Sequence, residues 1–154
     1  MRELIQKFDI RIISRLQRIE ILLARTAIFI VYFWFGLLKL FGVSPAAPLV
    51  QALFKKTIHF MPFTTFYTLF AIFEVAIGLL FLVRGLERLA ILLIGLHLIT
   101  TILPLIFLPH IAWQAFLVPT LEGQYIIKNV LIAAIAVVVG SKLVPITSTD
   151  KTKQ

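Results

Sequence analysis

Five polar residues stand inside or beside long apolar stretches of the sequence and are its best candidates for chemistry. They are Glu74, His97, Lys39, Lys128 and Asn129. An ionisable side chain within a membrane span is costly to insert, so it needs a partner or a polar cavity and marks a candidate functional site. We interpret the five as the lining of an outward-opening pocket that binds a ligand. Glu74 would form its floor, His97 one side and the two lysines its mouth.

The composition of the chain indicates a membrane protein. Of 154 residues, 60% are apolar and only 14% are charged, and the mean hydropathy is +1.03. A soluble domain carries about 25% charged and about 45–50% apolar residues. These values exclude an ordinary cytosolic globule, a disordered chain and a small disulfide-rich secreted domain. The chain has no cysteine, which excludes thiol redox chemistry, cysteine-held iron–sulfur clusters and covalent c-type haem.

Four apolar segments are long enough to cross a hydrocarbon core of about 30 Å once their interfacial flanks are counted. They cover approximately residues 25–41, 65–83, 89–108 and 124–142. The third contains Pro104, which should kink it. The sequence therefore predicts an all-α membrane protein whose domain, residues 21–144, is a bundle of four transmembrane helices.

Two shorter amphipathic helices are predicted outside the spans. Residues 1–20 repeat apolar side chains at helical spacing beside a basic stripe, which suits a helix lying on anionic lipid headgroups. The stripe consists of Lys7, Arg11, Arg15 and Arg18. Residues 49–58, between two prolines, have the same period but are too short to span, so we expect an interfacial helix there. Residues 145–154 read as a polar tail.

Orientation follows from the distribution of the 15 basic residues, because cytoplasmic loops are enriched in Lys and Arg. With both termini in the cytoplasm, 11 of them fall on the inner side and 4 on the outer side. We therefore expect an integral protein of the bacterial cytoplasmic (inner) membrane with both termini inside. The basic isoelectric point reflects this bias and the N-terminal helix, so no nucleic-acid partner is expected.

The rise of about 1.5 Å per helical residue gives each polar residue a depth. Glu74 and His97 come out at nearly equal depth, about 12–14 Å from the inner boundary, on helices joined by a tight turn. Lys39 and Lys128 lie farther out, and a stem of about 6 Å could lower each ammonium towards Glu74. Two other interpretations remain open: Glu74 and a lysine form a purely structural pair, or the lysines extend to the outer interface.

Metal and haem chemistry find little support in the sequence. A haem held by two histidines needs a second histidine at the depth of His97, and His59 and His110 both lie outside the spans. A zinc or di-iron site needs several converging histidines and carboxylates, so no metal site is predicted. Neither a phosphate-binding loop nor a nucleophile elbow is present.

Three segments resemble the DoxX-like membrane proteins. The stretch RTAIFIVYFWFGLLKLF has the family's opening arginine and Gly-x-x-Lys close, here Arg25, Gly36 and Lys39. The stretch FAIFEVAIGLLFLVRG is similar to the pattern Glu-x-x-x-Gly-x-x-Leu, with Glu74 and Gly78. The start of the fourth span resembles the YkgB-like branch, whose Gly-x-x-x-x-Lys element Gly123 and Lys128 match.

The resemblance covers approximately residues 20–142 and implies a four-helix membrane bundle. For the namesake branch it implies a small subunit of a membrane sulfur oxidoreductase that reduces quinone. We therefore expect an accessory or quinone-binding subunit of a membrane redox assembly, with a redox partner subunit. Two alternatives stay open at this point: a protein that binds or transports lipid or a small solute, and a scaffold or chaperone-like membrane subunit without a ligand.

Overall fold

The computed structural model describes residues 1–145, which are mostly helical, with short connecting loops and one small hairpin. The elements are α1 (Arg2–Leu40), α2 (Ala47–Thr57), α3 (Phe63–Leu82), α4 (Glu87–Phe107), α5 (Pro109–Ala112), β1 (Trp113–Ala115), β2 (Val118–Pro119) and α6 (Leu121–Ser141). Four helices, α1, α3, α4 and α6, are long and apolar enough to cross a membrane. The predicted all-α bundle with four spans is confirmed. The expected polar tail falls almost wholly on residues 146–154, outside the described residues.

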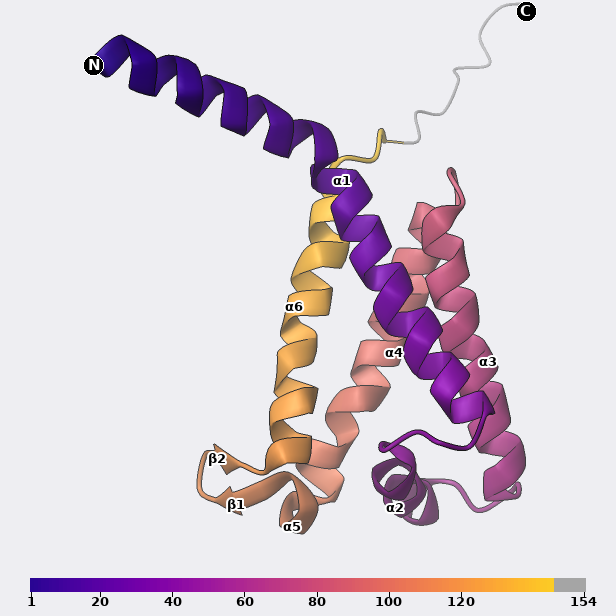
Figure 1. The fold of residues 1–154 in the computed structure, drawn as a ribbon. Helices are drawn as coiled ribbons and strands as arrows, with labels where there is room; N and C mark the ends of the chain where they lie inside the picture. The colour runs from indigo at the N-terminus through magenta and orange to yellow at the C-terminus, as the bar shows by residue number, and fades with distance from the viewer. Residues whose placement is uncertain (146–154) are drawn as a thin grey trace, which may run out of the picture.

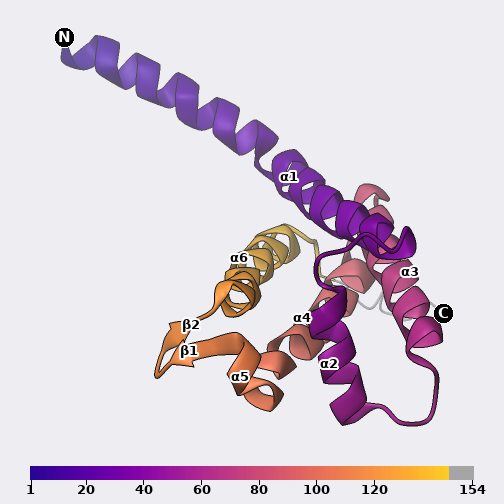
Figure 2. The ribbon, with the colours of Figure 1, turned by 60° about the horizontal axis from the view of Figure 1, so that its bottom comes forward.

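The two ends of the bundle carry different structural elements (Figure 1). At one end lie the turn between α3 and α4 and the last turn of α6, and α1 enters there from its N-terminal part. We call this the terminal end. At the other, distal end lie α2, α5 and the antiparallel hairpin of β1 and β2 (Figure 2). The chain thus begins its first span and ends its last one on the same side.

Helices α1 and α3 share the most extensive interface, and glycines let them approach closely. A Cβ atom placed on Gly36 of α1 would lie 2.7 Å from Val75 Cγ2 and 2.9 Å from the Val75 amide nitrogen of α3. One placed on Gly78 of α3 would lie 2.8 Å from the Phe33 amide nitrogen of α1. Small residues permit such backbone contact, which supplies the van der Waals packing that holds helices together in lipid.

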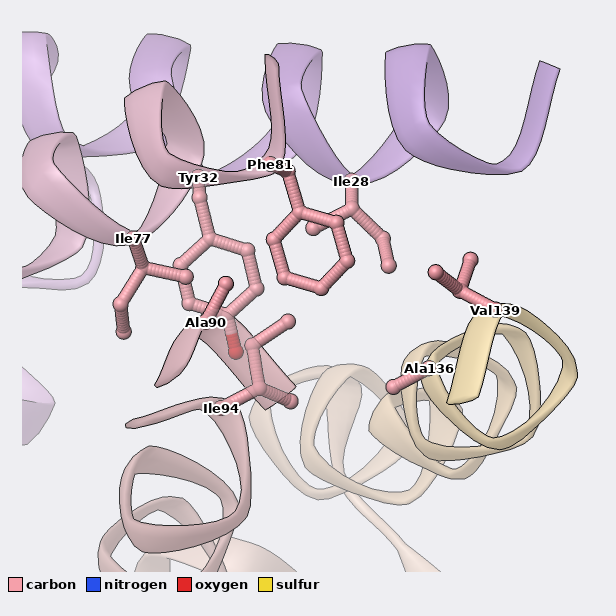
Figure 3. Close-up of a cluster of buried hydrophobic side chains, with 8 residues drawn as sticks. All are labelled: Ile28, Tyr32, Ile77, Phe81, Ala90, Ile94, Ala136 and Val139. Atoms are coloured by element: carbon pink, nitrogen blue, oxygen red, sulfur yellow. The ribbon is translucent and has the colours of Figure 1, made fainter. Parts of the chain in front are cut away.

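The buried apolar core joins all four spans (Figure 3). It consists of Ile28, Tyr32, Ile77, Phe81, Ala90, Ile94, Ala136 and Val139. These side chains come from α1, α3, α4 and α6 and are at most 4% exposed. Many other apolar side chains of the spans are exposed, as lipid-facing residues are. The core therefore fixes the relative positions of the helices that carry the candidate site.

The terminal end is held by ion pairs. The Arg25 guanidinium of α1 donates to Glu87 Oε1 of α4 and to the Phe81 carbonyl of α3, both at 2.7 Å. Glu87 Oε2 in turn accepts the Gly85 amide at 2.7 Å, which closes the turn between α3 and α4. These contacts join three helices in one network.

Proline chemistry shapes the distal end. Pro109 has no N–H to donate to the Leu105 carbonyl four residues earlier, and α4 ends just before it. The Trp113 indole N–H donates to that carbonyl instead, at 3.0 Å. The hairpin then leads into α6, whose first turn is capped by the Thr120 side chain accepting from the Gly123 amide.

Helix α1 differs from the sequence expectation in its continuity. We expected a helix over residues 1–20 followed by a separate span, but a single helix runs through the boundary. Residues 2–35 contain neither proline nor glycine, so nothing in the sequence ends the helix. Its N-terminal part turns away from the bundle (Figure 1), and its apolar side chains, including Ile5 and Phe8, stay exposed. We call residues 2–19 the N-terminal arm.

The threading can be checked by cysteine labelling, since the native chain has no thiol to interfere. Arg84 is exposed at the terminal end and Gln114 is exposed on the hairpin at the distal end. With the termini cytoplasmic, Gln114→Cys should react with an impermeant maleimide in intact cells, and Arg84→Cys should react only after the cells are permeabilised. Labelling of Arg84→Cys from outside would reverse the orientation that the charge bias predicts.

The close contact of Gly78 with the α1 backbone leads to a second prediction. Gly78→Ala should destabilise the bundle by about 1–3 kcal/mol, because the added methyl meets the α1 backbone and cannot move aside. Gly95→Ala on α4 is the matched control, since nothing lies within 4 Å of its Cβ position. Thermal or denaturant unfolding in detergent should show a loss for the first variant and none for the second. Equal stabilities would mean that α1 and α3 are not in backbone contact.

Candidate functional site

Glu74 is the centre of a buried polar cluster between α1, α3 and α4. Glu74 is only 5% exposed, and each carboxylate oxygen lies beside a different basic side chain, although Oε2 makes no hydrogen bond of good geometry among residues 1–145. Oε1 lies 3.0 Å from His97 Nε2 of α4, and Oε2 lies 2.5 Å from Lys39 Nζ of α1. Lys39 and His97 are themselves 8% and 7% exposed. The structure thus brings together three of the five residues that the sequence singled out.

A fourth member, Tyr32, extends the cluster along α1. Its hydroxyl lies 3.1 Å from His97 Nδ1, and the two rings meet edge to face with centroids 5.0 Å apart. One arrangement of protons satisfies both contacts with a neutral imidazole: Nε2–H donates to Glu74, and Nδ1 accepts the tyrosine O–H. The result is a continuous chain from Lys39 through Glu74 and His97 to Tyr32. We call these four residues the polar chain.

Helical spacing explains why these side chains meet. Tyr32, Gly36 and Lys39 follow one another at intervals of four and three residues and so share a face of α1. Gly36 is the residue that touches α3, so the same face turns Lys39 towards Glu74. On α3, Glu74 lies four residues before Gly78, the second point of close approach. The two glycines therefore set the distance across which the ion pair forms.

Aromatic rings shield the polar chain from lipid and water. Phe70 of α3 stacks on His97 with ring centroids 5.3 Å apart and planes at 13°. The Lys39 ammonium lies 5.6 Å from the centre of the same ring, within the range of a cation–π contact. Phe73 lies on another side of His97, with centroids 6.2 Å apart. In such surroundings the ion pair is little screened, and removing either charge leaves the other unsatisfied.

Lys128 and Asn129 of α6 do not join the polar chain. Lys128 is exposed, and its ammonium lies 5.1 Å from the centre of the Tyr125 ring. The Asn129 amide donates to Thr101 Oγ1 of α4 at 3.3 Å and so links α6 to α4. The depth predicted for Lys128 would suit a contact with Glu74. Its position around the axis of α6, however, points the side chain away from Glu74. Of the two lysines, only Lys39 pairs with the carboxylate in the part of the chain that the structure describes.

The cluster is closely packed in this conformation, and none of its four members is more than 8% exposed. The two best-formed hollows among residues 1–145 are shallow and lie at the distal end. One is on α3 beside Thr64 and Thr68, and the other is on the hairpin beside Trp113 and Phe116. Neither is lined by a member of the polar chain. A ligand can reach Glu74 only if neighbouring side chains or helices move.

The residues predicted to contact lipid headgroups lie on the N-terminal arm. Lys7, Arg11, Arg15 and Arg18 are all exposed there, beside apolar side chains that pack against nothing in the described part of the chain. A basic stripe next to an uncovered apolar one has the character of a helix at an anionic membrane surface.

Two members of the environment were not identified from the sequence. Tyr32 and Phe70 are aromatic residues in aromatic-rich spans, so their types alone did not distinguish them. The available signal was spacing: Tyr32 lies one turn before Gly36, and Phe70 one turn before Glu74. For metals, no group of three or more His, Cys, Asp or Glu is placed to hold an ion within residues 1–145.

The comparisons with known proteins do not extend this description. No family model matches the sequence, and no curated protein or solved structure matches the chain. Function must therefore be argued from the polar chain itself.

The energetic coupling within the polar chain is testable by a double-mutant cycle. Lys39→Met should destabilise the protein by about 3–5 kcal/mol, because it leaves the Glu74 carboxylate buried without a counter-charge. Adding Glu74→Gln should restore part of that loss, so the two changes should be clearly non-additive. Lys128→Met, which removes an exposed lysine, is the control and should change the stability by less than about 0.5 kcal/mol. Additive losses would show that the pair does not form.

Proposed function

We propose that this protein is a small subunit of a membrane redox assembly, in which the polar chain holds and transfers protons for a quinone-type substrate. The observation that carries the proposal is the continuous contact from Lys39 through Glu74 and His97 to Tyr32, buried within the spans. Each member can hold or pass a proton, and histidine does so near neutral pH. Intramembrane chains of acidic residues and histidines commonly serve as proton relays.

The chemistry of the donors suits a quinone carbonyl. Reduction of a quinone to a quinol takes up two electrons and two protons. The Lys39 ammonium has three N–H donors and can bond a carbonyl oxygen while it pairs with Glu74, and the Tyr32 hydroxyl can do so when its O–H turns from His97 Nδ1; Glu74 orients both through contacts with Lys39 and His97. We assign the supply of electrons to a partner subunit, since the chain has no cysteine. This division of labour fits the resemblance to DoxX-like subunits.

The setting of the protein is part of the proposal. We infer that the terminal end faces the cytoplasm of a bacterial cell, because most basic residues lie there, and that the N-terminal arm rests on the anionic inner leaflet. The arm would then hold the bundle at a fixed height.

One observation favours a second candidate, a scaffold subunit without a ligand. Both Glu74 oxygens lie beside a basic side chain of the same chain, and Glu74, Lys39 and His97 are each at most 8% exposed. Fixing the positions of the helices would by itself account for a closed, neutralised cluster of this kind. The two functions differ in what Glu74→Gln does to bound molecules.

Mass spectrometry of the protein purified from native membranes distinguishes them. The native chain should retain quinone, and Glu74→Gln should lose it about tenfold or more, because a hydrogen bond from a charged group contributes about 1.5–3 kcal/mol. Glu122→Gln, the same change at an exposed site, should retain quinone. Size-exclusion chromatography and thermal unfolding verify that each variant is folded.

Three results would contradict the redox proposal. Native protein that carries lipid or another solute in place of quinone would support the binding or transport alternative. Native protein with no bound molecule, or a folded Glu74→Gln variant that keeps its full quinone, would leave the scaffold function as the better account.

A further inference from the structure

The terminal half of the bundle is sealed by apolar packing. Seven of the eight side chains of this core, all but Tyr32, lie on the terminal side of the polar chain, whereas Ala71, Leu108 and Ala112 are buried towards the distal end. Ile28 precedes Tyr32 by one turn of α1, Phe81 follows Glu74 by two turns of α3, and Ile94 precedes His97 by three residues on α4. Figure 3 shows these side chains converging, and none of the three is more than 1% exposed. Water and ions that enter from the terminal end must cross this apolar packing before they reach His97.

The distal half has a few buried aliphatic side chains and, beside them, a column of aromatic rings. Phe54 of α2 lies 5.0 Å from Phe66 of α3, Phe66 lies 5.9 Å from Phe70, and Phe70 lies 5.3 Å from His97, all between ring centroids. The rings connect the distal surface directly to the polar chain. We call Phe54, Phe66 and Phe70 the aromatic column. Flat rings can separate and stack again with little change in the backbone, unlike interlocked aliphatic side chains.

Helix α2 lies across the distal end of the bundle beside α4 (Figure 2) and makes few contacts with it. Phe54 is its only buried residue. Among the described residues, its only side-chain hydrogen bond to another helix runs from Lys56 Nζ to the Phe107 carbonyl of α4, at 2.9 Å. A loop containing Gly42, with φ of +71°, precedes it, and a short non-helical segment follows it. The helix can therefore lift without disturbing the four spans.

A buried polar group lies beside the column. The Tyr67 hydroxyl of α3 is buried next to the Ser44 side chain, and the geometry of that contact falls short of a good hydrogen bond. The Tyr67 ring packs against Phe63, with centroids 5.1 Å apart. A hydroxyl bonded this weakly can accept or donate a hydrogen bond to a water or ligand oxygen that enters the distal half.

We propose that the polar chain is reached from the distal end alone, through the aromatic column, and that α2 is the lid over this route. The Lys56 hydrogen bond latches the lid, and Tyr67 is the first polar contact inside it. The route admits protons, carried by water, and the flat ring of an aromatic or quinone-type molecule from the distal leaflet. Entry of a quinone-type molecule rests on the proposed function, whereas access from the distal end alone does not.

Cysteine accessibility tests the route without any ligand. The Tyr67→Cys variant is treated with a small impermeant methanethiosulfonate. The reagent is added to intact cells to reach the distal side and to inverted membrane vesicles to reach the terminal side. We expect modification from the distal side only. Adding Lys56→Gln should speed it about fivefold, the factor that corresponds to a net hydrogen bond of about 1 kcal/mol. Lys55→Gln removes the neighbouring exposed lysine, whose side chain makes no hydrogen bond to the described residues, and should leave the rate unchanged.

Two further variants keep the test decisive. Ile94→Cys lies in the sealed half and should resist the reagent from both sides. Phe63→Cys, at the distal start of the same wall, replaces Tyr67→Cys if that variant does not fold. Faster modification of Tyr67→Cys from the terminal side, or equal rates with Lys56→Gln and Lys55→Gln, would overturn the proposal. Neither outcome depends on whether quinone is retained, so the proposed function and the access route can fail separately.

Discussion

A carboxylate within the apolar interior of a membrane bundle is the constraint on which the rest of this structure depends. Glu74 cannot stay ionised there unless other groups replace the water it has lost. Lys39 provides the counter-charge and His97 a hydrogen bond, and each comes from a different helix. Helices α1, α3 and α4 must therefore meet at one depth and in one rotation. The glycines of the α1–α3 interface and the Arg25–Glu87 pair at the terminal end hold them there.

The same constraint divides the bundle into unlike halves. An ion pair in a low-dielectric site is strong only while water is excluded, and the aliphatic core excludes it from the terminal side. On the distal side the exclusion relies on aromatic rings and a peripheral helix. This asymmetry is what the proposed exchange of protons with one side of the membrane would require. The architecture thus bears on function even though Glu74 is closely packed.

The sequence predicted the spans well, because about twenty consecutive apolar residues are typical of a transmembrane helix. It also placed Glu74, His97 and Lys39 at compatible depths, since depth follows from counting residues along a helix. It failed where rotation about the helix axis decides the outcome: Lys128 has the right depth but faces outward. Tyr32 was missed for a related reason, because only tertiary packing selects one aromatic residue among many. The N-terminal arm and the first span were predicted to be two helices, although no residue between them breaks the helix.

The unbroken course of α1 has an evolutionary consequence. Its 39 residues form one hydrogen-bonded helix with a contour of about 58 Å, bent where the N-terminal arm leaves the bundle, so the arm and Lys39 keep a fixed helical phase relative to each other. Inserting a single residue between the arm and Arg25 would rotate the basic stripe by about 100° relative to the bundle and lift it away from the lipid. Seven inserted residues would nearly restore the original phase. Related chains should therefore vary in this region by whole turns, and a helix-breaking residue should appear wherever that rule is not kept.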